Sequence, residues 1–401
     1  MREANFVPWG WEGFVPESSL QLSSDTLLIR LSADPNTPPR CHGCGASCGH
    51  VHDTQLRRIR DRDLFEYRVW LEVPVRRVIC RSCGVGRERI DWLLPHARLT
   101  ERLRRHAEVL LQLMPIKHVS HLTGLHWHTL KQIDKDRLTR TLPAPDPASL
   151  RYLAMDEFAL FKGHRYATVV INAENRQVVW VGEGRSRRDI RPFFAWLGDH
   201  AQQIEAVVMD MNSAMDLEVK AHCSRARVVY DLFHVIAKFG REVIDRVRVD
   251  EANRLRDDKP GRKVIKQSRW LLLRNRGNLQ DNQRVRLDEL LAANHPLMLV
   301  YLMKEQLKIM WYAPSEKEAR RRWRQWYEQA MESAVEPLIR FAKRLKPYLD
   351  GIVSSATYRL NTSVLEGINN RIKVIKRMAY GFRDNEYFFL KIKAAFPGLP
   401  R

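Results

Sequence analysis

The middle of the chain alternates between two kinds of hydrophobic pattern. Residues 151–160, 165–173 and 176–184 are rich in β-branched and aromatic residues, with turn residues between them, and predict three successive strands. Residues 189–201 and 213–223 have the apolar spacing of helices, whereas 204–210 and 226–230 predict two further strands. A strand meander followed by alternating helix and strand predicts an α/β sheet.

The part of the chain before this sheet is more helical. Residues 100–141 predict an amphipathic helix and then two short helices joined at Thr123–Gly124, the second running from about Trp127 to Arg137. This outline is that of a helix-turn-helix, with an ordinary helical hairpin as the alternative. Its second helix offers four polar side chains to a DNA groove: His128, Lys131, Gln132 and Lys135. The proline-rich stretch "PAPDPAS" that follows predicts a linker.

The charge balance points to a polyanionic partner. Lys and Arg number 68 against 47 Asp and Glu, which gives a formal net charge of +21. Such an excess repels itself in the folded state unless a polyanion neutralises it, so nucleic acid is the natural partner. The cations are spread along the chain, which argues against a membrane surface, whereas structural RNA stays open on charge alone. No signal-peptide or membrane-span pattern is visible, and we expect the protein in the cytoplasm.

Two Cys-x-x-Cys pairs predict a metal site. "CHGCG" contains Cys41 and Cys44, and "CRSCG" contains Cys80 and Cys83. Paired thiolates two residues apart, each pair followed by a glycine that tolerates a tight turn, fit a tetrahedral structural zinc ion. The β-rich segment between the pairs predicts a zinc-ribbon-like hairpin. A redox role is the alternative, although it does not explain two pairs.

Two aspartates stand out in the predicted sheet, whose element order is that expected of an RNase H-like fold. Asp156 interrupts an apolar strand, and Asp210 ends another at the carboxyl edge where open α/β sheets build their sites. Together they could hold magnesium, which prefers carboxylate oxygens. Alternatively, Asp210 caps the next helix and Asp156 pairs with an arginine. Glu157 should point to the opposite face of its strand and is the weaker candidate.

Near the end of the chain, "TSVLEGINNRIKVIKRMAYGFRD" predicts a helix with one polar face. Glu366 begins this face, and amides and cations continue it: Asn369, Asn370, Lys373 and Arg377. A capping box with Ser363 explains the glutamate but not the rest of the face. A metal-binding Glu366 with a DNA backbone along the helix explains both. Asp231 and His234, in "YDLFHV", either assist the metal site, orient a phosphate or have buried structural roles.

These motifs together resemble a known family. The double Cys-x-x-Cys, the helix-turn-helix, "MDEFA", "RYATVV", "VVMDM", "DLFHV" and "NNRIKVIKRMAYGFRD" are similar to those of insertion-sequence transposases of the ISL-three (ISL3) family over nearly the whole chain. The last two motifs are the most specific. The resemblance implies a DDE transposase with an RNase H-like catalytic domain, in which Asp156, Asp210 and Glu366 are the acidic triad.

The resemblance also implies an organisation and a reaction. We expect a zinc-binding domain over 1–95, a helix-turn-helix domain over 96–142, a linker over 143–150, and a catalytic core over 151–250 and 351–401 that is interrupted by a mostly helical insertion over 251–350. Within this insertion, "RRRWRQWYEQ" predicts a helix whose aromatic residues face the core, with stacking on DNA bases as the alternative.

Two magnesium or manganese ions would support cleavage and joining of DNA at terminal inverted repeats. A homodimer on double-stranded DNA, in a prokaryotic cytoplasm and associated with the nucleoid when bound, would bring together the element's ends and the target. Two alternatives remain: a nuclease or resolvase on the same sheet that cuts without joining, and a catalytically inactive zinc-containing DNA-binding regulator.

Overall fold

The computed structural model describes residues 10–161, 163, 165–360 and 363–399, and the side chains of 363–365 lie outside the described residues. The chain divides into two compact units, residues 1–141 and 142–401, which we call unit 1 and unit 2. Each unit has its own hydrophobic core. Among the helices that the structure describes, none is long and apolar enough to cross a membrane.

Unit 1 begins with a five-stranded sheet. Its strands are β1 (Phe14–Ser23), β2 (Thr26–Ala33), β3 (Val51–Arg60), β4 (Arg68–Cys80) and β5 (Gly84–Arg87), in the order β1-β2-β4-β3, with β5 on β4. The β3–β4 pair is antiparallel and separates the two cysteine pairs, as the sequence predicts. Every second side chain of β4 from Val69 to Val75 is buried, which is the alternation of a half-buried strand. The β1–β2 hairpin and the parallel β2–β4 pairing were not predicted.

Three helices complete unit 1: α1 (Glu101–Leu113), α2 (Ile116–Thr123) and α3 (Trp127–Thr141). Gly124 follows α2 with φ of 68°, a left-handed conformation that glycine adopts without strain. The third helix begins where the sequence predicts but runs four residues beyond Arg137, because Leu138 is buried and continues the apolar face. Asp61, fully buried, accepts hydrogen bonds from Trp11 and Thr100 and so joins the start of α1 to the sheet.

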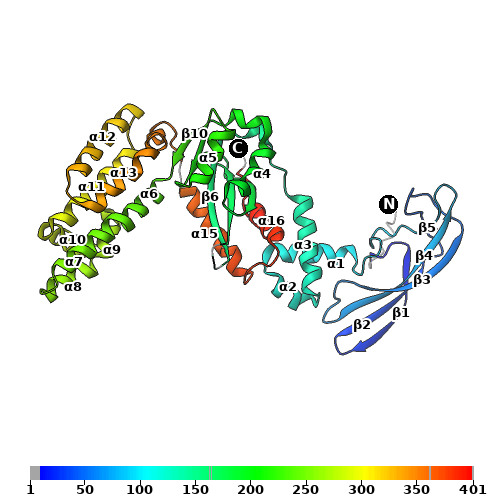
Figure 1. Cartoon of the computed structure of the whole chain (residues 1–401). Helices are drawn as coiled ribbons and strands as arrows, with labels where there is room; N and C mark the ends of the chain where they lie inside the picture. The colour runs from blue at the N-terminus through cyan, green and yellow to red at the C-terminus, as the bar shows by residue number, and fades with distance from the viewer. Residues whose placement is uncertain (1–9, 162, 164, 361–362, 400–401) are drawn as a thin grey trace, which may run out of the picture. The chain divides into compact units, whose positions relative to one another are not determined.

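Unit 2 contains the predicted α/β sheet. Its elements are β6 (Tyr152–Phe161), β7 (Arg165–Asn172), β8 (Val178–Glu183), α4 (Arg187–Leu197), β9 (Ala206–Met209), α5 (Ser213–His222) and β10 (Arg227–Tyr230). The order is β10-β9-β6-β7-β8: β6, β7 and β8 are antiparallel neighbours, and β9 and β10 run parallel to β6. One face packs against α4 and α5. The other face packs against α15 (Ser363–Met378) and α16 (Asn385–Ala395), drawn in orange and red in Figure 1.

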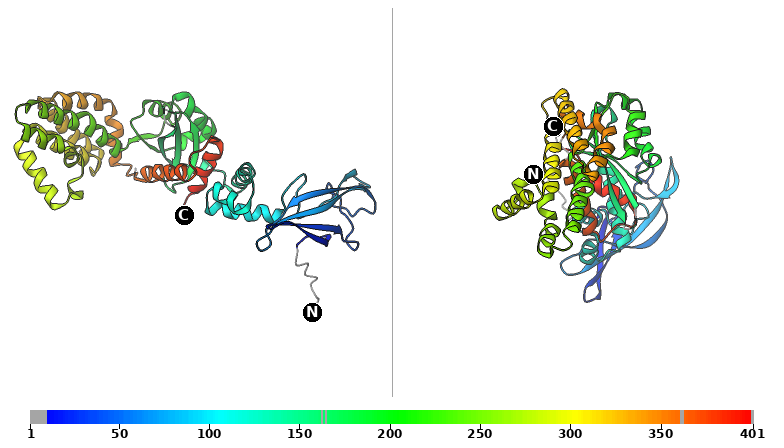
Figure 2. Two further views of the ribbon diagram at one scale, coloured as in Figure 1. Left: turned by 90° about the horizontal axis from the view of Figure 1, so that it is seen from below. Right: turned by 60° about the vertical axis from the view of Figure 1, so that its left-hand side comes forward.

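A helical region lies between β10 and α15 in the sequence (Figure 2). Its helices are α6 (Leu232–Phe239), α7 (Asp245–Arg254), α8 (Lys259–Gln267), α9 (Arg269–Leu273), α10 (Asp281–Ala293), α11 (His295–Trp311), α12 (Glu316–Glu332), α13 (Glu336–Leu345) and α14 (Leu349–Val353), with a π-helical turn at Gly240–Ile244. The core interpretation of α12 is confirmed. Trp323 and Trp326 are buried, and Trp326 donates to the carbonyl of Met303, whereas Arg321 pairs with Glu318 at the surface.

Candidate active site and metal centre

Three aspartates lie in a row across the sheet of unit 2. The last paired residues of β6, β9 and β10 lie opposite one another in the sheet. Each is followed directly by an aspartate: Asp156 after β6, Asp210 after β9 and Asp231 after β10. Because neighbouring parallel strands are about 4.8 Å apart, the register brings these residues side by side at the carboxyl edge of β9 and β10.

The three carboxylates also share one face of the sheet. Two residues before each aspartate stand Ala154, Val208 and Val229, all of which belong to the hydrophobic cluster that α15 and α16 cover. Side chains two apart on a strand point to the same side, so the aspartates face these two helices. Glu157 points the other way, as predicted, and pairs with Arg185.

Asp156 is a buried carboxylate without a cationic neighbour strong enough to compensate its burial. Its side chain is 6% exposed, and among the described residues no arginine or lysine forms an ion pair with it, so the arginine alternative is not what the structure shows. Burial is the main cause that raises the pKa of Asp156 to about 6; the charges of Asp210 and Asp231 act in the same direction, whereas the Glu157 backbone N–H and His234 act to lower it. Such a carboxylate fits a divalent cation, which would restore the missing positive charge.

The other two aspartates differ in their surroundings. Asp210 is partly exposed and accepts from the backbone N–H of Met211, whereas the N-cap of α5 is Asn212, so Asp210 does not cap that helix. Asp231 is buried and caps α6 by accepting from Phe233. Between them lies His234, whose Nδ1 is 3.7 Å from Asp210 Oδ1 and 3.5 Å from Asp231 Oδ2.

Helix α15 contacts the first strand of this site directly. Asn369 Nδ2 donates to Asp156 Oδ2 over 2.6 Å, and Lys376 Nζ donates to the carbonyl of Ala159 over 3.1 Å. Glu366 is exposed and precedes Asn369 by three residues, so it lies one turn earlier on the same side of the helix. The proposed capping partner, the Ser363 side chain, lies outside the described residues.

Farther along this helix the polar face opens to solvent. Asn370, Lys373 and Arg377 are exposed, and Lys373 Nζ lies 3.5 Å from Asn370 Oδ1. Asn369 is the member of the predicted face that turns toward Asp156 instead. In the part of the chain that the structure describes, one group of three or more His, Cys, Asp or Glu side chains has its ligand atoms within 4.8 Å of one another. That group does not include Asp156, Asp210 or Glu366. Glu366 therefore does not form a close cluster with Asp156 and Asp210 in this form of the protein.

The group whose ligand atoms do lie within 4.8 Å of one another consists of the four predicted cysteines of unit 1: Cys41, Cys44, Cys80 and Cys83. Backbone N–H groups of Cys83 and Ser82 lower the pKa of Cys80 to about 6, which favours the thiolate that binds a metal. Four sulfurs at this spacing fit a tetrahedral zinc ion. Cys48 is buried beside this cluster, and its Sγ lies 3.6 Å from the carbonyl of Ala46.

The second helix of the predicted helix-turn-helix is α3, which presents a polar side. His128 is exposed, Lys131 lies over the ring of Trp127, and Gln132 donates to Asp136 over 2.7 Å. Lys135 is half-buried on the same helix.

Comparison with known proteins decides the family. A family model described as a transposase, the DDE domain of ISL3 transposases, matches residues 153–392, which is more than half of the chain. The chain belongs to the ISL3 family of transposases. Two further models match unit 1: the helix-turn-helix domain of transposase family ISL3 over residues 88–138, and the zinc-finger of transposase IS204/IS1001/IS1096/IS1165 over residues 37–83.

Named transposases are similar to the chain over most of their length. The transposase for insertion sequence element IS1001 of Bordetella parapertussis is 52% identical over 395 residues, which cover 98% of this chain and 97% of the relative. The transposase for IS1557 of Mycobacterium tuberculosis is 27% identical over 371 residues, 86% of this chain and 83% of the relative. A Drosophila P element transposase strand transfer complex matches 76% of this chain and 93% of that chain at 10% identity, with a TM-score of 0.39 that supports no structural argument.

This ISL3 transposase is therefore an insertion-sequence transposase of the DDE type, as its sequence predicts, and its helix-turn-helix domain implies that it binds DNA. Its zinc-finger match and its cysteine cluster both indicate zinc. Sequence reasoning missed the contact between Asn369 and Asp156, which are 213 residues apart and gave no shared signal. The place of Asp231 in the row could have been found, because it follows its strand just as Asp210 does.

Proposed function

We propose that this transposase cuts and joins DNA with an acidic triad of Asp156, Asp210 and Glu366, carried by an RNase H-like core. The observation that supports this most strongly is the register that aligns Asp156 with Asp210, together with the docking of α15 on Asp156 through Asn369. The sheet order β10-β9-β6-β7-β8, with three antiparallel strands followed by two parallel ones, supports the RNase H-like description. The helices between β10 and α15 are then an insertion in that core.

The triad is suited to two magnesium or manganese ions. When bound, such ions activate the attacking oxygen and stabilise the leaving oxygen of an in-line phosphoryl transfer. Asp156 supplies a desolvated carboxylate at the centre of the site, and Asp210 supplies a partly exposed one beside it. Glu366 reaches the same site when α15 moves or when DNA and metal draw its carboxylate inward, since it lies one turn from the residue that contacts Asp156.

The surrounding residues position the DNA. The exposed face of α15, with Asn370, Lys373 and Arg377, is suited to the phosphate backbone beside the triad. Asn369 holds the Asp156 carboxylate in place. We assign the recognition of the terminal inverted repeats to unit 1, where a structural zinc ion stabilises the hairpin and the polar side of α3 reads the groove. Because two ends must be joined to one target, a homodimer on DNA is the simplest assembly.

A metal-dependent assay on DNA that carries the element's own ends tests the triad. Wild type, Glu366→Gln and the matched control Glu386→Gln are compared for nicking and joining with magnesium or manganese. Glutamine preserves the size of the side chain but removes the charge that a metal needs. Loss of both products with Glu366→Gln alone, while end binding persists, is the expected result. Equal activity of all three proteins excludes Glu366 from the triad, and nicking without joining by wild type favours a nuclease.

A further inference from the structure

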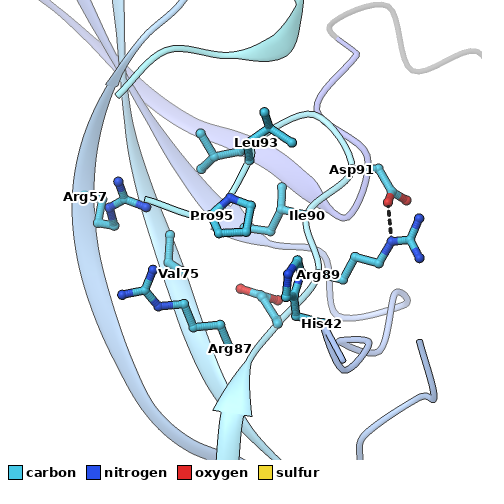
Figure 3. A pocket seen from close by; sticks show the side chains of 11 residues that line it. His42, Arg57, Val75, Arg87, Arg89, Ile90, Asp91, Leu93 and Pro95 are labelled. Carbon is cyan, nitrogen blue, oxygen red and sulfur yellow. Dashed lines mark hydrogen bonds and ion pairs between the residues drawn. The ribbon is translucent and has the colours of Figure 1, made fainter. Parts of the chain in front are cut away.

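A pocket of about 270 Å³ lies beside the cysteine cluster in unit 1 (Figure 3). Its walls come from β3, β4, the segment around and after β5, and the turn of the first cysteine pair, which contributes His42; the other lining residues include Arg57, Val75, Arg87 and Pro95. In Figure 3 the guanidinium groups of Arg57 and Arg87 lie near each other beside Val75. A water molecule occupies about 30 Å³ of liquid volume, so the pocket has room for an anion larger than water and for several waters.

The carboxylates of this pocket are already engaged by other cations. Glu88 is buried and binds the guanidinium of Arg76 at 2.6 Å, and Asp91 pairs with Arg40 and with Arg89, which also lines the pocket. Neither is therefore free to neutralise the other arginines inside the pocket.

Arg57 and Arg87 keep uncompensated charge. The Arg57 side chain donates from Nη2 to a neutral group, the carbonyl of Ala97, over 2.7 Å. Arg87 Nη1 is buried and has no hydrogen-bond partner among the described residues. Burial lowers the pKa of Arg57, and the positive charges of Arg87 and Arg98 lower it further. Like charges held together at partial burial are costly without an anion.

We propose that this pocket binds one phosphate group of the DNA backbone, with Arg57 and Arg87 as its ligands. The guanidinium fork matches two phosphate oxygens, and the unused Nη1 of Arg87 is a donor without a protein acceptor. Such a contact fixes the position of unit 1 on the duplex and reads no base. The inference rests on the proposed recognition of DNA by unit 1, and it adds a specific anchoring point to the groove contacts of α3.

The salt dependence of DNA binding tests this site. Full-length wild type, Arg57→Gln, Arg87→Gln and the double variant are titrated with duplex DNA of the element's ends at several salt concentrations, without magnesium or manganese. The slope of log affinity against log salt should become shallower by about 0.9 in the double variant, the value for one phosphate contact. Affinity at fixed salt should fall about tenfold or more, equally for end and unrelated sequences. Arg58→Gln, at the exposed neighbouring position of β3, should change neither.

A second arm locates the phosphate. Duplexes that carry a neutral methylphosphonate at one backbone position at a time should include a position that weakens wild-type binding but leaves the double variant unaffected. An unchanged slope with an identical interference pattern overturns the proposal. It is also overturned if inorganic phosphate at constant ionic strength protects wild type thermally while the DNA slope stays the same, since the pocket then binds free phosphate.

Two controls separate this test from other failures. Zinc content and thermal unfolding report whether the glutamine variants fold. If they do not fold, the Arg57→Lys, Arg87→Lys double variant is used in their place, because it preserves both charges. In the lysine pair the slope should be retained while affinity falls, because the charge persists without the fork. The measurement needs no catalysis, so an error in the assignment of Glu366 leaves its outcome unchanged.

Discussion

The buried charge of Asp156 should make the metal-free wild-type transposase less stable than a variant that lacks this charge. Its carboxyl group has a pKa of about 6 in the folded protein against an ordinary value of 3.8, chiefly because the group is buried. A group whose folded pKa is raised favours folding when protonated, and this contribution is lost as the pH rises through the folded pKa. Above about pH 6 the folded protein therefore carries a buried charge, which Asp156→Asn removes.

The size of the effect follows from the two pKa values. The difference between 3.8 and about 6 corresponds to about 3 kcal/mol at pH 7.5, at 1.36 kcal/mol per unit. The amide introduced by Asp156→Asn cannot accept hydrogen bonds from both the Glu157 backbone and Asn369 as the carboxylate does, and one lost bond costs about 1 kcal/mol. We therefore expect Asp156→Asn to stabilise the metal-free protein by about 2 kcal/mol at pH 7.5 and by clearly less at pH 5, where part of the folded-state carboxyl group is already protonated.

Urea unfolding followed by far-ultraviolet circular dichroism measures this difference at the two pH values. Asp210→Asn is the comparison variant: its side chain is 38% exposed, so the change should stabilise the protein less than Asp156→Asn does, and only through the negative charge that it removes from beside Asp156. Added magnesium should stabilise wild type and leave Asp156→Asn unchanged, since binding to the folded state alone raises stability. If Asp156→Asn is no more stable than wild type at pH 7.5, or if its advantage does not shrink at pH 5, burial of the Asp156 charge does not destabilise the metal-free protein.

Three further predictions test separate parts of the structure. Cys83→Ser should abolish zinc binding, whereas Cys48→Ser should retain it; zinc content measured by atomic absorption separates the two. Trp326→Ala should lower the free energy of unfolding by about 3–5 kcal/mol, because the indole is 2% exposed, and a change confined to DNA affinity would argue for base stacking. Gly124→Ala should cost unit 1 about 1–2 kcal/mol, since φ is positive and the added Cβ approaches the Arg68 guanidinium at 3.1 Å; an unchanged thermal midpoint would contradict this.

Local pattern was sufficient for much of unit 2 because neighbouring residues decide strands and helices. The period-two and buried runs predicted all five strands, and Asp156 and Asp210 were recognisable since a carboxylate in or after an apolar strand is rare without a purpose. Helix α3 was predicted four residues too short because Leu138 is stabilised by packing that local spacing does not show.

Contacts between distant parts of the chain could not be predicted in the same way. The hydrogen bond from Asn369 to Asp156 depends on where α15 docks on the sheet. The parallel pairing of β2 with β4 depends on how the chain of unit 1 returns to the sheet after β3. Arg57 and Arg87 likewise line the same pocket only because the tertiary structure brings their strands together. Each of these required the tertiary structure, since single-chain spacing carries no information about such partners.

Locating the metal ions is the experiment that decides whether Asp156, Asp210 and Glu366 form the triad. Crystals of the transposase with its DNA ends and manganese would show the ions by their anomalous scattering. We expect ions contacted by all three carboxylates, with α15 still docked through Asn369. Ions held by Asp156, Asp210 and Asp231 while Glu366 stays in solvent would contradict this triad.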